Sequence, residues 1–243
     1  MQPKTKNILD NSFDILTKIL LILLPFHVFI SVFFEFKIGM SFFPLYKELI
    51  LVLLSLSLAR NFYKNNSRPK FDKLDYLIFA YFGYLILVTL VDRLGLKSLF
   101  YGARYDFEFF FVFLLMKHGR QFLQKPVSYY IKLFLLSGGA AIFIGVLVRF
   151  IFKETILINF GFSAGVSQWD IGGSVPIYHS IEGANVRRFQ GIFDGPNQAA
   201  YFLLVYIGVL LHYFRNNKDY QFVAGCIVIG LFGLIFMTYS RSS

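Results

Sequence analysis

The chain has 243 residues, of which 56% are hydrophobic, 20% aromatic and only 16% charged, and its mean hydropathy is +0.60. A soluble domain is about a quarter charged and a disordered chain is poor in apolar residues, so this composition argues against the first and excludes the second. A single cysteine excludes a disulfide framework and a thiolate metal cluster. The composition therefore indicates a membrane protein. In such a protein, the net charge of +10 has to be interpreted from the positions of the lysines and arginines.

Seven mostly apolar runs approach the roughly 20 residues that a helix needs to cross a bilayer. We therefore expect an all-α, polytopic membrane protein in which residues 1–243 form a single membrane domain. In chain order the expected helices cover 14–34, 42–59, 74–91, 99–116, 127–151, 196–213 and 221–239, and one long extracytoplasmic loop covers 152–195.

The first and fourth of these helices carry additional information. No small-residue cleavage site follows the first helix, so we expect it to be retained rather than removed as a signal peptide. The outer half of the fourth contains Arg104, Asp106 and Glu108. Arg104 and Glu108 are four residues apart on one helical face and can neutralise each other, as burial would require. Alternatively, Arg104 adds to an outer phosphate site while Asp106 or Glu108 contacts an acceptor sugar.

The lysines and arginines of the short loops orient the chain. With the N-terminus in the cytoplasm, the inside segments hold twelve of these residues and the outside segments hold six. The cations then face anionic lipid, which accounts for most of the positive charge. No basic stripe with interleaved aromatic residues indicates a nucleic-acid partner. The inside segments under this orientation are 1–13, 60–73, 117–126 and 214–220.

The 152–195 loop is long for a compact domain and keeps many apolar residues, so we expect a functional rather than a disordered loop. It ends in Asp194-Gly195-Pro196, where Asp194 is the expected N-cap and Pro196 suits the first turn of the sixth helix. Such a helix start attracts phosphate, and Arg187 and Arg188 precede Pro196 by nine and eight residues. The alternative is a plain helix start beside a solvated pair of arginines.

The last predicted helix ends in Thr238-Tyr239-Ser240-Arg241-Ser242, which places Arg241 at the same outer interface. An arginine that only reaches the lipid headgroups is the alternative interpretation. His179 lies in the outer loop and is a secondary candidate for catalysis. No group of His, Cys, Asp and Glu has metal-ligand spacing, so we expect neither a metal nor a cofactor.

Two of these segments together resemble the O-antigen ligase and O-antigen polymerase family. The sequence from Arg188 to Ala200, RFQGIFDGPNQAA, is similar to that family's R-x-x-G-x-F-x-x-P-N motif, and Thr238–Ser242 is similar to its S-R-[SGA] motif one helical hairpin later. The resemblance implies a glycosyltransferase of the bacterial inner membrane. Such an enzyme moves a glycan from undecaprenyl pyrophosphate to a lipid A-core or another glycan, without a nucleotide sugar, metal or cofactor.

By position, Arg188 and Arg241 match the arginines that this resemblance implies bind the pyrophosphate, and Asn197 matches the motif asparagine. Arg187 and Gln190 are neighbouring candidates for the same binding. Family members continue past the second motif with further helices and a loop that carries a histidine base, whereas this sequence stops two residues after Arg241. We therefore expect a C-terminally truncated member and leave the catalytic residue unassigned.

Two other functional classes stay open. A transporter would show repeated halves and helices broken by Gly or Pro in mid-membrane, and Gly138-Gly139 is the only sign of such a break. A non-catalytic membrane scaffold is the other alternative for a chain without the usual base. The sequence distinguishes neither the glycan and its acceptor nor ligation from polymerisation.

Overall fold

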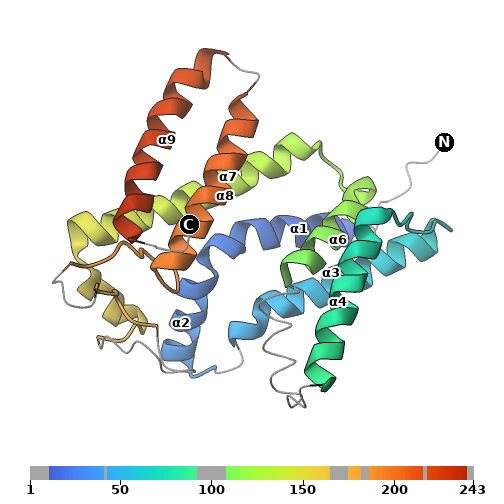
Figure 1. The fold of residues 1–243 in the computed structure, drawn as a ribbon, viewed down its shortest axis with the longest axis horizontal. Helices are drawn as coiled ribbons and strands as arrows, with labels where there is room; N and C mark the ends of the chain where they lie inside the picture. The colour runs from blue at the N-terminus through green and yellow to red at the C-terminus, as the bar shows by residue number, and fades with distance from the viewer. Residues whose placement is uncertain are drawn as a thin grey trace, which may run out of the picture. The chain divides into compact units, whose positions relative to one another are not determined.

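The computed structural model describes residues 11–40, 43–91, 108–164, 175–181, 186–215 and 218–239. These residues are helical apart from short connections and two isolated β-bridges, Ser163–Pro176 and Ser180–Arg187 (Figure 1). Within the described residues, five helices are long and apolar enough to cross a membrane. The chain is thus an all-α polytopic membrane protein, as the sequence predicts.

The five apolar helices coincide with five of the seven predicted spans. The second predicted span is helix α3 (Tyr46–Lys64), but Lys47, Glu48 and Arg60 leave it an uncharged stretch of only eleven residues, 49–59. Such a stretch falls short of the roughly 20 apolar residues of a typical span. The fourth predicted span lies partly outside the described residues, which begin again at α6 (Glu108–Gly119). The five apolar helices are Ser12–Ile38, Lys73–Val91, Val127–Phe152, Pro196–Phe214 and Tyr220–Thr238.

Pro25 interrupts the first of these helices. Helix α1 (Ser12–Leu23) passes through a 3₁₀ turn, η2 (Leu24–Phe26), into α2 (His27–Ile38), and Figure 1 shows the resulting bend. Proline has no N–H to donate and its ring clashes with the preceding helical turn, so a bend is expected at this position.

The contacts divide the chain into two compact units. The first consists of Met1–Thr17 and Glu48–Gln124, and the second of Lys18–Lys47 and Lys125–Ser243. In the first unit, the fully buried ring of Phe13 packs against Gly119, where a Cβ atom would come within 2.0 Å of it. The same unit contains α3, α4 (Lys73–Val91), α6 and η5 (Arg120–Phe122).

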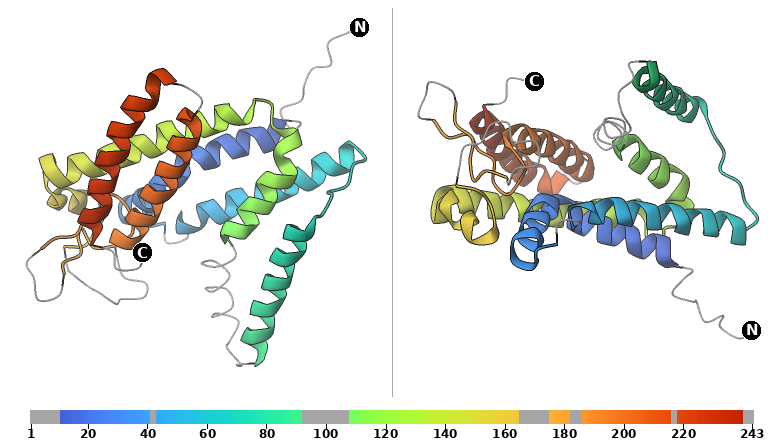
Figure 2. Two further views of the ribbon diagram at one scale, coloured as in Figure 1. Left: turned by 45° about the horizontal axis from the view of Figure 1, so that its top comes forward. Right: turned by 90° about the horizontal axis from the view of Figure 1, so that it is seen from below.

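The second unit is built around α7 (Val127–Leu147) and the hairpin of α8 (Pro196–Phe214) and α9 (Lys218–Thr238). The hydroxyl of Tyr206 on α8 donates to the carbonyl of Leu135 on α7 at 2.9 Å, and Leu203 is fully buried between the helices. Figure 2 shows the segment after 175 lying beside the end of the hairpin where α8 begins and α9 ends. The first motif and Thr238, the first residue of the second motif, therefore lie at one end of this unit.

Candidate functional site

The segment before α8 is held by backbone pairing and by buried side chains. The N–H of Arg188 donates to the carbonyl of His179 at 2.8 Å, and the N–H of Phe189 donates to the carbonyl of Met237 at 2.8 Å. Phe189 is fully buried and Ile192 is 1% exposed. These contacts join both sequence motifs, because Phe189 belongs to the first and Met237 directly precedes the second.

A close approach of two glycines seats this segment on α7. A Cβ atom on Gly145 would lie 3.1 Å from the Cα atom of Gly191, and Gly191 has a φ of +64°. Glycine suits position 191 for two reasons. It tolerates a positive φ, and its lack of a side chain leaves room for α7. The glycine of the first motif thus sets the distance between the loop and α7.

Helix α8 begins at Pro196, as the sequence predicts, but its N-cap is not the expected residue. Its N-cap is Gly195 in extended conformation, which has no side chain to cap the helix, and Pro196 occupies the first turn. The predicted N-cap, Asp194, is exposed and precedes the cap. The prediction of Asp194 was wrong because the carbonyl of Gly195 accepts the first helical bond, from Ala199 at 3.0 Å. The N–H groups of Asn197 and Gln198 in the first turn still have no acceptor within the helix.

Arg188 is half-buried beside this helix start. Its Nε atom donates to the carbonyl of Thr238 at 2.6 Å, and its Nη2 atom donates to Oδ1 of Asn197 at 2.9 Å. In the part of the chain that the structure describes, the other three of its five N–H groups have no partner. Burial lowers the pKa of the Arg188 guanidinium, which nevertheless stays protonated at neutral pH. The site therefore holds a fixed positive charge with unused donors.

Arg187 makes different contacts. Its Nη1 atom lies 3.3 Å from Oε2 of Glu154, and its guanidinium carbon lies 4.5 Å from the ring centroid of Tyr178. The other carboxylate oxygen of Glu154 accepts from Arg149, whose Nη2 atom donates to the backbone carbonyl of Arg187 at 3.0 Å. Arg149 and Arg187 thus share the carboxylate of Glu154.

Gln190 fixes the tautomer of the neutral His179 imidazole. The Gln190 side chain is 2% exposed, and its Nε2 atom donates to the carbonyls of Pro176 at 2.9 Å and Phe193 at 3.0 Å. Since carbonyls only accept, the amide oxygen must face Nδ1 of His179, which lies 2.7 Å away. Neutral His179 therefore carries its proton on Nδ1 and presents an unprotonated Nε2. The imidazole also lies against the start of α8, with Cε1 3.7 Å from the position of a Cβ atom on Gly195.

The structure brings together Arg188, Asn197, Gln190 and His179, and it places Arg187 beside them. Arg241, Arg104 and Asp106 lie outside the described residues, and Glu108 begins α6 in the first unit. Within the described ranges, no group of three His, Cys, Asp or Glu side chains could hold a metal ion.

Sequence reasoning missed Arg149 and Glu154. Arg149 lies in a π-helical turn, η6 (Val148–Phe152), which extends α7, and Glu154 opens the 3₁₀ helix η7 (Glu154–Phe160). A charged residue near the outer end of an otherwise apolar helix is the one signal that could have identified Arg149, since such residues need a partner.

Comparisons of this chain with models of protein families, with curated proteins and with solved structures find no match.

Proposed function

We propose that this membrane protein transfers a glycan from a polyprenyl pyrophosphate carrier to a glycan or lipid A-core acceptor, in the manner of the O-antigen ligase and polymerase family. The observation that carries the proposal is the position of Arg188, which is fixed between the carbonyl of Thr238 and the side chain of Asn197 at the first turn of α8. In the proposed orientation this site faces the outer side of the bacterial inner membrane.

The site has the chemistry that a diphosphate requires. A helix start supplies N–H donors and a partial positive charge, and an arginine fork binds phosphate oxygens in pairs. Arg188 supplies the fixed cation, and Asn197 and Gln198 supply first-turn N–H groups. Arg187 and Arg149 share Glu154, so they shape the loop and add a diffuse positive field.

The second arginine of the proposed site is Arg241. It follows Thr238 by three residues, and three extended residues span at most about 11 Å. Because the carbonyl of Thr238 accepts directly from Arg188, the contact supports a shared role for the two motifs. Together the two arginines would neutralise charge on the departing pyrophosphate.

His179 is the proposed base in this reaction. The acceptor hydroxyl oxygen forms a bond to the anomeric carbon while the bond from that carbon to the pyrophosphate breaks. The hydroxyl proton passes to Nε2 of His179, and the pyrophosphate leaves on its polyprenyl chain. Gln190 holds the imidazole in the form that can accept this proton, which is the arrangement of a base with its orienting partner.

Substitutions in the bacterium that carries this chain test the proposal. We expect Arg188→Ala and Arg188→Lys to abolish surface glycan, because lysine cannot replace the two directed bonds of the guanidinium. We expect His179→Ala to abolish transfer while pyrophosphate binding by the purified protein persists. Arg215→Ala, at the other end of α8, is the matched control and should leave glycan normal. Normal glycan in the Arg188 variants, at normal membrane levels of the protein, would contradict the proposal.

A further inference from the structure

The first unit contains an apolar pocket with a volume of about 390 Å³. Its walls come from α3, from the segment that joins α3 to α4, and from α4 and α6. The volume falls within the range of small-molecule sites. Among the lining side chains are Leu58, Ala59, Phe62, Pro69, Phe71 and Phe79.

The segment between α3 and α4 alternates in character along one wall of this pocket. Pro69 and Phe71 line the pocket, and the neighbouring Arg68 and Lys70 are exposed, as is 45% of Phe71. The segment therefore places two cations directly beside residues that line the pocket. Lys73, at the first position of α4, is exposed and extends this cationic edge.

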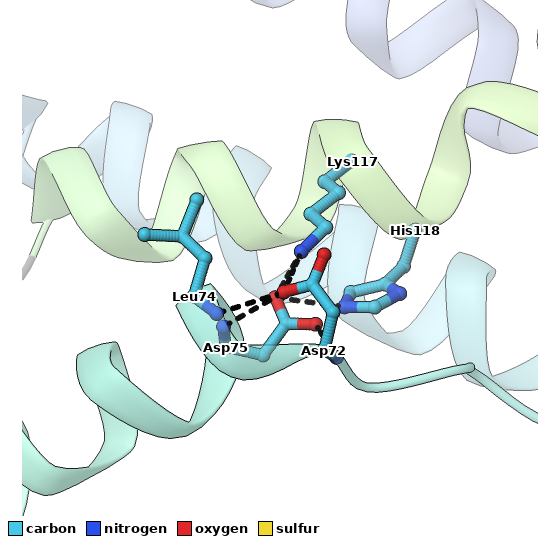
Figure 3. A network of polar contacts seen from close by, with 5 residues as sticks. All are labelled: Asp72, Leu74, Asp75, Lys117 and His118. Atoms are coloured by element: carbon cyan, nitrogen blue, oxygen red, sulfur yellow. Dashed lines mark hydrogen bonds and ion pairs between the residues drawn. The ribbon is translucent and has the colours of Figure 1, made fainter.

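The carboxylates near this edge are already paired. Figure 3 shows Lys117 between Asp72 and Asp75, with Nζ 2.7 Å from Oδ1 of Asp72 and 2.8 Å from Oδ1 of Asp75. Asp75 is fully buried, and Nε2 of His118, which lines the pocket, lies 3.4 Å from its Oδ1 atom. Lys117 compensates one of these two negative charges, so the three cations Arg68, Lys70 and Lys73 still outnumber the one that remains.

We propose that this pocket binds one acyl chain of an anionic phospholipid, whose phosphate is held by Arg68, Lys70 and Lys73. An apolar cleft bordered by three exposed cations complements a lipid with a net negative headgroup, whereas a zwitterionic headgroup brings a cation of its own to the same edge. The site belongs to the first unit and is independent of the proposed glycan transfer.

Lipid retention by the purified full-length chain tests this proposal. Detergent-solubilised protein is incubated with phosphatidylglycerol or phosphatidylcholine of the same acyl composition, and bound lipid is counted by native mass spectrometry. We expect the wild type to retain phosphatidylglycerol at least about tenfold better, and added salt to weaken the preference. Equal retention of the two lipids would overturn the proposal.

Two variants separate the headgroup site from the acyl site. Replacing Arg68, Lys70 and Lys73 together by Gln should reduce phosphatidylglycerol retention to the phosphatidylcholine level. The matched control removes three exposed cations elsewhere, Arg120, Lys125 and Arg215, and should retain the preference.

Ala59→Trp should fill the pocket and lower retention of both lipids, whereas Leu56→Trp on the same helix should not, because Leu56 is 62% exposed and does not line it. Should Ala59→Trp lose helical content by circular dichroism, the triple Gln variant decides the matter. Undiminished phosphatidylglycerol retention by that folded triple variant would refute the headgroup assignment.

Discussion

At the scale of single residues, the site depends on one buried amide. Gln190 satisfies two backbone carbonyls and orients His179, so its side chain links loop stability to the proposed chemistry. We expect Gln190→Met, of similar shape, to lower stability by about 2 kcal/mol or more, since each buried polar group left unpaired costs about 1–3 kcal/mol. Gln198→Met is the matched control, because Gln198 is exposed in the first turn of α8.

Thermal unfolding in detergent measures this difference. For a chain of this size, about 2 kcal/mol corresponds to a Tm lower by about 4–8 °C, whereas Gln198→Met should leave Tm unchanged. Equal Tm values for the two variants would show that Gln190 does not anchor the loop.

The pairing of Asp72 with Lys117 makes stability depend on pH. The hydrogen bond from Lys117, followed by the backbone N–H of Asp75, lowers the pKa of Asp72 from its ordinary value of 3.8. A carboxylate whose pKa is depressed by folding stabilises the folded state fully above its unfolded pKa, and this contribution disappears as pH falls through the folded value. We therefore expect wild type to be more stable than Asp72→Asn at about pH 7, and we expect this difference to shrink as pH falls below about 4.

Asparagine is the informative replacement because it also caps helices. Asp72 accepts from the N–H groups of Leu74 and Asp75 at the start of α4, and asparagine can keep these bonds while removing the charge. Tm measured for both proteins across this pH range tests the expectation. A Tm difference that stays constant down to the acid end would exclude the Asp72 charge as its source.

The sequence predicted the residues around Arg188 but not those around Arg149. Arg188 and Asn197 lie nine residues apart in one motif of ten residues, so a helix start brings them together by local geometry. Arg149 and Glu154 meet only because α7 ends in a π-helical turn and Lys153 adopts a φ of +63°. Lysine rarely takes that conformation, so nothing in the sequence indicates the reversal.

At the scale of elements, the contact between α7 and the loop before α8 sets the geometry of the site. We expect Gly145→Ala to destabilise the protein by about 1–2 kcal/mol, because its Cβ atom would meet the backbone of Gly191 at 3.1 Å. Gly208→Ala is the control on α8, where no heavy atom lies within 4 Å of the added carbon. Thermal unfolding compares the two variants, and a loss of stability in Gly208→Ala alone would contradict this packing.

Helices were easier to predict than their boundaries and breaks. Long uncharged runs identified α4, α7, α8 and α9 because apolar length is what a membrane helix requires. In contrast, α3 has an apolar centre but charged ends, so its uncharged stretch, residues 49–59, is shorter than those of these four helices. The bend at Pro25 has a visible cause in the sequence, although the direction of the bend depends on the packing of α2.

At the scale of the whole molecule, the orientation across the membrane remains a prediction from the distribution of lysine and arginine. Single cysteines in a Cys226→Ser background test it, because Cys226 is the only native cysteine. We expect Val186→Cys, in the outer loop, to react with a membrane-impermeant maleimide in spheroplasts. We expect Gln124→Cys, in a predicted cytoplasmic segment, to react only after permeabilisation. The reverse pattern would invert the proposed orientation and move the site to the cytoplasmic face.

Binding of the lipid carrier tests the central claim most directly. The full-length chain in nanodiscs is titrated with undecaprenyl pyrophosphate and, separately, with undecaprenyl monophosphate. We expect wild type and Arg215→Ala to prefer the pyrophosphate, and Arg188→Ala to bind it at least about tenfold more weakly, a loss of about 1.4 kcal/mol. Equal pyrophosphate affinity in wild type and Arg188→Ala would contradict the claim that Arg188 holds the diphosphate.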